Sequence, residues 1–359
     1  VMCLGLVACG KTGNKETSTN DTTKKTESST DASKAGGEKE GSNISVCVVF
    51  SGNLGDKSYN DSCYQGAMRA AEDFGVEIKT LEGTEPAEWE ANFLAAAEGD
   101  YDLIICSSSN LAEYLKEHNK NYADKKFAII DTVVEGDNIV SVSFAQNQGS
   151  FLAGAAAAMF TKMTNIEGVN EDNVIGWVGG MDIPVLHDFY IGYEQGAKYI
   201  DPNITILQSF AGTWNDPLKG KELTLAQYEQ GADIVMNVAS GTGTGILEGA
   251  AEAKKYAIGV DLNQDNDQPG HVLTSMVKRV DNACYLLIES VVKNTFKGGS
   301  EAYLTLADGG VSLTDFSVMK EHLGDKFPEE IITRIDELSK KIISGEIVVE
   351  NYEGFGPKK

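Results

Sequence analysis

The stretch SVCVVFSGNLGDKSYNDSCYQGAMRAAEDFGVEIKTL, residues 45–81, decides the fold class. It opens with a largely β-branched run that ends at Ser51-Gly52, a pattern typical of a buried parallel strand. Small and apolar side chains then recur with helical spacing from Cys63 to Phe74, and a second strand pattern follows at 77–81. A strand, a helix and a strand in this order predict a βαβ unit.

The same alternation continues along the rest of the chain. Further strands are predicted at 102–106, 126–131, 139–144, 174–178, 204–209, 233–238, 256–260 and 272–277. Helices are predicted at 86–98, 110–121, 149–163, 187–199, 217–230, 243–254 and 281–296, with a closing helix from Pro328 to a stop at Gly345. Two successive sets of βα units predict an α/β protein with two doubly wound sheets. A chain of 359 residues is also long enough for two lobes.

The N-terminal residues are interpreted as a targeting segment. The apolar run VMCLGLVA, residues 1–8, is too short to span a bilayer and fits the tail of a signal peptide. Ala8-Cys9 completes a sequence that resembles the bacterial lipobox, which makes Cys9 the predicted lipid anchor; the alternative is a chance Ala-Cys pair. Residues 10–44 have almost nothing to bury and are predicted to form a disordered tether.

Charge and composition exclude several functions. A net charge of −24 argues against binding to nucleic acid, because such binding needs Lys and Arg to displace counterions. The scarcity of arginine beside lysine hints at a Gram-positive source. The six cysteines lack the spacing of a metal or redox site, so inert core thiols are expected. The four histidines and the serines 107–109 form no catalytic signature, so no catalytic residue, metal or cofactor is predicted.

Polar residues at the ends of the predicted strands are the candidate ligand contacts, because these ends face a shared cleft between two such sheets. The loop 55–60 combines an aromatic ring with Asp and Asn, which suits a flat ligand with a polar edge, although Asp56 and Asn60 could simply cap a helix. Asp131 ends a strand and either caps a turn or points into the cleft. Asp261 could accept hydrogen bonds from a vicinal diol, and Lys278 could donate to the same hydroxyls or be a solvated lysine.

The glycine-rich loop 240–245 follows a strand and opens a helix, but its spacing is G-x-G-x-G. This spacing lacks the last glycine of a dinucleotide-binding fingerprint. We therefore interpret the loop as a close approach of the backbone to a ligand rather than as a cofactor site.

From about residue 45 to the C-terminus the chain resembles the basic membrane protein family of substrate-binding lipoproteins, which includes the purine-nucleoside receptors of ABC importers. The matching segments are 56–60 (DKSYN), 149–154 (GSFLAG), 178–184 (VGGMDIP), 215–221 (NDPLKGK), 241–243 (GTG), 258–261 (IGVD) and 274–279 (TSMVKR). The family usually carries a Gly-Phe pair after the third strand, where this chain has Ser-Ser-Ser-Asn at 107–110, which makes the cleft more polar.

The resemblance implies a type I periplasmic-binding-protein fold, with two doubly wound lobes joined by a three-crossing hinge. The expected lobes are 45–145 with 275–298 and 146–274 with 299–359. It also implies that Asp261 and Lys278 hold ribose hydroxyls, while a base lies between Tyr59 and Phe189 with its polar edge at Asn60 and Asp131. The full expected set of ligand contacts is Asp56, Ser58, Tyr59, Asn60, Ser108, Asp131, Phe189, Trp214, Gly241, Thr242, Asp261 and Lys278.

The sequence thus predicts an extracytoplasmic solute-binding lipoprotein of an ABC importer that binds a purine nucleoside by domain closure. Its expected partners are the ligand, the permease subunits and, through the lipid anchor, the cell membrane. The alternatives are a receptor for a sugar or another small polar ligand, and a sensor or surface antigen with no role in transport. A hydrolase would need a general base beside a nucleophile, and a repressor of this fold would need a DNA-binding helix pair. The sequence shows neither feature, so neither function is predicted.

Overall fold

The computed structural model describes residues 43–356. The predicted signal-peptide remnant, Cys9 and nearly all of the predicted tether therefore lie outside the described residues. The described chain forms two six-stranded sheets with helices on both faces. We call the first sheet with its helices the first half, and the second sheet with its helices the second half.

The first sheet has the strand order β2-β1-β3-β4-β5-β11, and its strands pair in parallel. Its apolar runs fill the centre: β1, β3 and β4 are buried over almost their whole length, as expected for strands covered by helices on both faces. The strands are β1 (Ser45–Val49), β2 (Glu77–Leu81), β3 (Leu103–Cys106), β4 (Phe127–Ile130), β5 (Ile139–Phe144) and β11 (Ser300–Leu304). The helices are α1 (Tyr59–Phe74), α2 (Pro86–Glu98), α3 (Ala112–His118) and α8 (Val280–Val292).

The second sheet repeats this order as β7-β6-β8-β9-β10-β12, with β12 antiparallel to β10. Its strands are β6 (Val174–Gly179), β7 (Thr205–Phe210), β8 (Ala232–Val238), β9 (Tyr256–Asp261), β10 (Val272–Lys278) and β12 (Val311–Leu313). Its helices are α4 (Gln146–Phe160), α5 (Pro184–Ile200), α6 (Pro217–Glu229), α7 (Gly243–Ala253), α9 (Ser317–Leu323) and α10 (Glu329–Ile343). Short 3-10 turns lie at Ser109–Leu111, Asn119–Tyr122, Ser240–Thr242 and Gly324–Lys326.

The chain passes between the two sheets three times, after β5, after β10 and after β11. This agrees with the expected three-crossing hinge, but two details of the predicted lobes need correction. The boundary at 274/275 falls inside β10, and β11 pairs with β5 of the first sheet although residues 299–359 were assigned to the second lobe. The segment 300–304 contains no run of buried apolar residues, so its sequence gives little indication of a strand.

Helices α4 and α5 of the second half pack very closely against each other. A Cβ atom added at Gly196 of α5 would lie 1.9 Å from the carbonyl oxygen of Phe151 in α4, so only glycine allows this approach. The closing helix α10 buries Ile331, Ile335 and Leu338 on one face, as its sequence pattern predicts. Residues 43–356 contain no helix with the length and apolar character needed to cross a bilayer.

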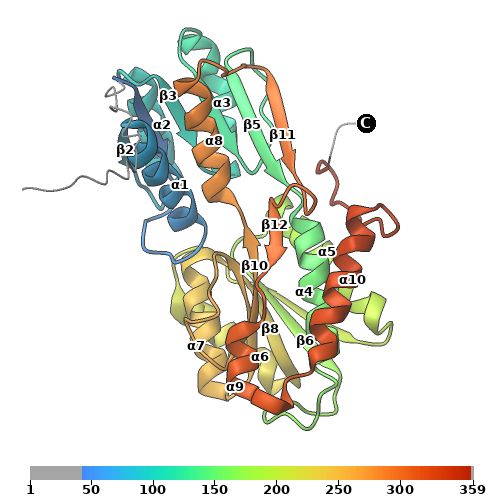
Figure 1. Ribbon diagram of the computed structural model, residues 1–359. Helices are drawn as coiled ribbons and strands as arrows, with labels where there is room; N and C mark the ends of the chain where they lie inside the picture. Colours follow the sequence, from blue (N-terminus) through green and yellow to red (C-terminus); the bar gives the residue numbers. More distant parts are fainter. Residues whose placement is uncertain (1–42, 357–359) are drawn as a thin grey trace, which may run out of the picture. The chain divides into compact units, whose positions relative to one another are not determined.

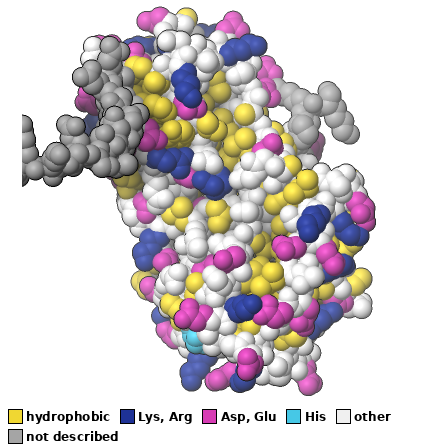
Figure 2. All heavy atoms as spheres, viewed as in Figure 1, with side chains coloured by type: hydrophobic (Ala, Val, Ile, Leu, Met, Phe, Trp, Pro, Cys, Tyr) yellow, Lys and Arg dark blue, Asp and Glu magenta, His cyan; other side chains and the backbone are white. Residues whose placement is uncertain are grey.

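The space-filling view shows hydrophobic side chains gathered over the first half (Figure 2). They surround a groove between α8 and the strands β5 and β11, whose rim includes the half-exposed Leu286. The described cysteines, Cys47, Cys63, Cys106 and Cys284, are buried and carry free thiols.

Candidate ligand-binding site

Three strand ends carry non-glycine residues in the left-handed backbone region. Asp131 follows β4 with φ 77°, Ser240 follows β8 with φ 50°, and Asp261 ends β9 with φ 65°. This conformation is uncommon for residues with a Cβ atom and tends to occur where function requires it. All three residues border one cavity, at the place where the strands of the two sheets end.

The cavity is lined by residues of both halves and holds about 570 Å³ of empty space including its mouth. The lining residues are Ser51, Tyr59, Asn60, Ser108, Ser109, Asn110, Asp131, Ile183, Val185, Leu186, Phe189, Trp214, Val238, Ala239, Ser240, Asp261 and Lys278. The wall therefore combines apolar and aromatic surface with a small set of convergent polar groups.

Lys278 provides the charge at the centre of the site. It ends β10, is 1% exposed, and its ammonium group forms an ion pair with the buried carboxylate of Asp131 from the other sheet. Its Nζ atom also lies 5.1 Å from the ring centroids of Phe144 and Phe189 and 5.6 Å from that of Tyr59. Cation–π attraction to these ring faces stabilises the position of the buried ammonium group.

Asp261 is the second carboxylate of the cavity. Its Oδ2 atom accepts a hydrogen bond of 2.5 Å from the Ser58 hydroxyl, which comes from the first half. Burial raises the pKa of Asp261 to about 7, although nearby Lys278 and the hydrogen bond from Ser58 both favour the charged form. The carboxyl is therefore poised to change its charge near neutral pH.

Tyr59 begins α1 and places its ring at the cavity while its hydroxyl points into protein. The hydroxyl donates a 2.6 Å hydrogen bond to the carbonyl oxygen of Ser107. Burial, together with the nearby carboxylates of Asp131 and Asp261, raises the pKa of Tyr59 well above its ordinary value. The phenol thus remains neutral and presents a ring face, not a charge.

A group of hydroxyl and amide side chains lines another part of the wall. The hydroxyls of Ser51 and Ser108 are 2.6 Å apart, and the Asn110 amide donates to Ser51 at 3.2 Å. Ser51 follows β1, whereas Ser108 and Asn110 follow β3. The last two belong to the segment 107–110, which departs from the family pattern. The arrangement offers donors and acceptors to a polar ligand edge.

Asp56 serves the framework around the cavity. Its carboxylate accepts hydrogen bonds from the backbone N–H groups of Ser58, Asn60 and Asp61, so it anchors the first turn of α1. It also accepts a 2.7 Å hydrogen bond from the Ser240 hydroxyl of the second half. The helix-anchoring alternative therefore describes this residue in the structure.

The structure brings most of the predicted contacts together and leaves four of them off the cavity wall. Tyr59, Asn60, Ser108, Asp131, Phe189, Trp214, Asp261 and Lys278 line the cavity. Asp56, Ser58, Gly241 and Thr242 do not. Ser58 bonds to Asp261, and the Thr242 hydroxyl donates to Thr213 and accepts from Asp216, so these two residues support the wall from behind.

Several lining residues were not predicted. Ile183, Val185 and Leu186 surround the start of α5, where apolar side chains are easily taken for ordinary core positions. Ser51 lies two residues after β1, Val238 ends β8, and Ala239 and Ser240 follow it. Their position after a strand is a signal that could have identified them, because the carboxyl ends of parallel strands form the binding edge.

A family model described as "ABC transporter substrate-binding protein PnrA-like" (Bmp) matches residues 43–353. The chain belongs to the Bmp family. The expected family resemblance is thereby confirmed, and the chain is an ABC-transporter substrate-binding protein.

The similarity extends over most of the chain. Basic membrane protein A of Borreliella afzelii is 31% identical, covering 86% of this chain and 94% of the relative. A CD4+ T-cell-stimulating antigen of Listeria innocua is 29% identical, covering 90% and 92%. The crystal structure of an ABC-transporter solute-binding protein from Aeropyrum pernix has a TM-score of 0.79 and 30% identity, covering 86% of this chain and 94% of that one. The type I fold expected from the sequence is confirmed by these neighbours.

Proposed function

We propose that this Bmp-family chain is the extracytoplasmic, lipid-anchored receptor of an ABC importer, and that its cavity binds a purine nucleoside by closure of the two halves. The observation that carries the proposal is the convergence, in one cavity, of aromatic rings with a buried lysine and two carboxylates at strand ends. A nucleoside has the matching parts: a flat base and a sugar with neighbouring hydroxyls.

The rings suit the base. Tyr59, Phe189 and Trp214 all line the cavity, and aromatic side chains stack favourably on flat rings. Ser51, Ser108 and Asn110 offer hydrogen bonds that can reach the polar edge of a purine. Asn60 adds a further amide on the first half.

The charged groups suit the sugar and disfavour a phosphate. A carboxylate such as Asp261 can accept hydrogen bonds from both hydroxyls of a vicinal diol, and Lys278 can donate to the same oxygens. Lys278 is the cation of the described cavity wall, and Asp131 already balances its charge. A phosphate would therefore face two carboxyl groups without a free cation, which favours a nucleoside over a nucleotide.

Calorimetry and thermal shift with a ligand panel test the proposal. Inosine, guanosine and adenosine should bind, whereas adenine, ribose and guanosine monophosphate should bind at least tenfold more weakly. A nucleoside at about 100 times its Kd should stabilise the fold by about 2.7 kcal/mol. If a free sugar raises Tm and no nucleoside does, the cavity is a sugar site and the nucleoside proposal is wrong.

The lipid anchor is tested separately. Relatives from Pyrococcus furiosus and Pyrococcus abyssi are described as lipoproteins, which supports modification at Cys9. Mass spectrometry of the membrane-bound protein should find a diacylglyceryl group on Cys9, and Cys9→Ser should release the protein into the medium. An unmodified Cys9 in membrane-associated protein would contradict this assignment.

Relatives described as T-cell-stimulating antigens raise a role in surface display as the second candidate. Deletion of the gene should abolish uptake of radiolabelled inosine if the chain serves an importer. Unchanged uptake in the deletion strain would favour display without transport.

A further inference from the structure

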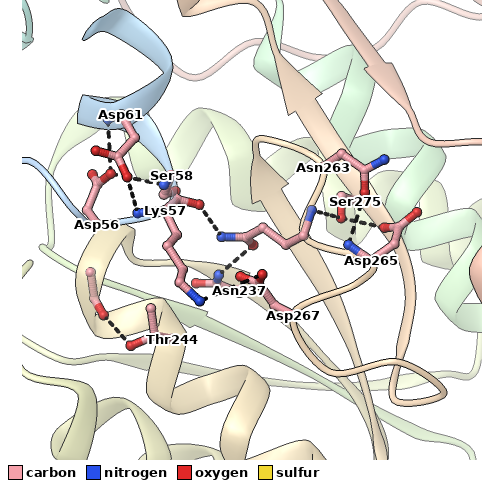
Figure 3. Close-up of polar contacts among 12 residues, drawn as sticks. Asp56, Lys57, Ser58, Asp61, Asn237, Thr244, Asn263, Asp265, Asp267 and Ser275 are labelled. Carbon is pink, nitrogen blue, oxygen red and sulfur yellow. Dashed lines mark hydrogen bonds and ion pairs between the residues drawn. The ribbon is translucent and has the colours of Figure 1, made fainter. Parts of the chain in front are cut away.

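The loop before α1 also meets the second half outside the cavity, through the side chain of Gln264. Its Nε2 atom donates a 3.0 Å hydrogen bond to the carbonyl oxygen of Lys57 in the first half. Its Oε1 atom accepts from the backbone N–H of Val260 at 2.9 Å and from the Asn237 amide at 3.3 Å. Figure 3 shows Lys57 and Ser58 at this junction, with Asn237 and Asp267 of the second half beside them.

The orientation of this amide is fixed by its surroundings. Gln264 is 1% exposed, and its backbone N–H donates to the hydroxyl of Ser275, which in turn donates to Asp265 at 2.6 Å. Two donors from the second half engage Oε1, so the Nε2 side must face an acceptor. The acceptor is the carbonyl of Lys57, and without it a buried N–H group would lack a partner.

We propose that Gln264 is a positioning residue for closure: its bond to the Lys57 carbonyl stabilises the closed arrangement of the halves and raises ligand affinity without contacting the ligand. The part that concerns ligand affinity rests on the proposed function. A contact made only in the closed state shifts the open–closed equilibrium by its own free energy, and the apparent Kd changes by the same factor.

The position of Lys57 links this bond to the cavity. Lys57 has φ 53° and precedes Ser58, whose hydroxyl binds Asp261, and Tyr59, whose ring lines the cavity. A bond that holds the Lys57 carbonyl therefore also helps to position the Ser58 hydroxyl on Asp261 and the Tyr59 ring at the cavity.

A second contact at this junction is the ion pair between the Lys57 ammonium and Asp267, at 3.8 Å. The Lys57 side chain is 62% exposed, so solvent screens this attraction. Of these two contacts, we therefore assign the effect on closure to the buried amide bond and expect Asp267→Asn to change affinity little.

The decisive variant is Gln264→Glu, which preserves the shape and the bonds accepted by Oε1 but cannot donate to Lys57 when ionised. At pH 8 its Kd for inosine should rise at least about fivefold, because a hydrogen bond is lost and a carboxylate oxygen then faces the carbonyl oxygen of Lys57. Hydrogen exchange in residues 55–61 and 261–268 should also be faster. At pH 5 the protonated carboxyl regains a donor, so the ratio of the variant Kd to the wild-type Kd should fall towards one.

Gln227→Met is the matched control. Gln227 is also buried in the second half, but its amide donates only to Trp177 and Ser209 of the same sheet. It should lower the stability while leaving the Kd for inosine and exchange at 55–61 unchanged. Gln264→Met, which removes the amide altogether, should behave like Gln264→Glu but without the recovery at pH 5.

Wild-type affinity and wild-type exchange in both Gln264→Met and Gln264→Glu at pH 8 would overturn the proposal. An effect in Gln227→Met equal to that in Gln264→Glu would also overturn it, because the change would then be one of general stability. If inosine fails to bind the wild-type protein, the nucleoside assignment is wrong, and the exchange comparison without nucleoside still decides whether Gln264 holds the halves together.

Discussion

Replacing Lys278 by methionine tests how the centre of the site is balanced. The Asp131 side chain is 9% exposed and its ion-pair partner Lys278 is 1% exposed, so the pair is almost fully desolvated. Methionine fills most of the lysine volume but leaves the Asp131 carboxylate without its counter-charge. Removing one partner of a buried pair costs about 3–5 kcal/mol, much of it from the charge left behind.

Urea denaturation at pH 7 should therefore show a drop of about 3–5 kcal/mol in the free energy of unfolding of Lys278→Met. The double variant Lys278→Met with Asp131→Asn removes both charges and should recover more than half of this loss. Lys198→Met, which breaks the exposed pair with Glu194, is the control and should cost at most about 0.5 kcal/mol.

A loss in Lys278→Met no larger than in the Lys198→Met control would refute the reasoning. So would a double variant that is less stable than Lys278→Met, because the uncompensated carboxylate would then not be the source of the cost. Inosine binding should be lost in both variants at this site and retained in the Lys198→Met control.

Three further predictions follow from the same geometry. Because burial raises the pKa of Asp261 from 3.8 to about 7, folding takes up a proton between these values and stability falls as the pH rises through that range. Asp261→Asn should thus gain stability over wild type at pH 8 but not at pH 4 in denaturation; equal gains would contradict this. Gly196→Ala, with its Cβ atom 1.9 Å from the Phe151 oxygen, should lower Tm by at least 5 °C or prevent folding, whereas Gly249→Ala, with contacts of 3.4 Å or more, should leave Tm unchanged or higher. Ser108→Ala removes a partner of the Ser51 hydroxyl and should raise the Kd for inosine about threefold in calorimetry, with little change in the Kd for free ribose. An unchanged Kd for inosine would show that this part of the wall does not recognise the base.

The sheets were predictable because their inner strands carry continuous apolar runs. Such runs as 46–50 and 103–106 identify buried parallel strands, and helical spacing between them sets the alternation. The edge strands β11 and β12 and the short helix α9 were not predicted. The residues of these elements are half-exposed or few in number. β11 and β12 become strands through pairing with a strand that is distant in the sequence, not through a local pattern.

The candidate site was predictable in part for a similar reason. Asp131 and Asp261 could be placed at one edge because parallel strands bring their carboxyl ends together. The pairing of Lys278 with Asp131 could not be read from the sequence, because it depends on how two separate sheets face each other. The role of Gln264 was missed for the same reason: its partners at Val260, Asn237 and Lys57 are joined only by the folded chain.

The three passages of the chain between the sheets also set the order in which the halves can mature during synthesis. The first sheet lacks its edge strand β11, and α1 lacks its neighbour α8, until residues 280–304 have emerged. By then every strand of the second sheet except β12 has already been made. Until that point β5 presents an unpaired edge, which invites association with other chains.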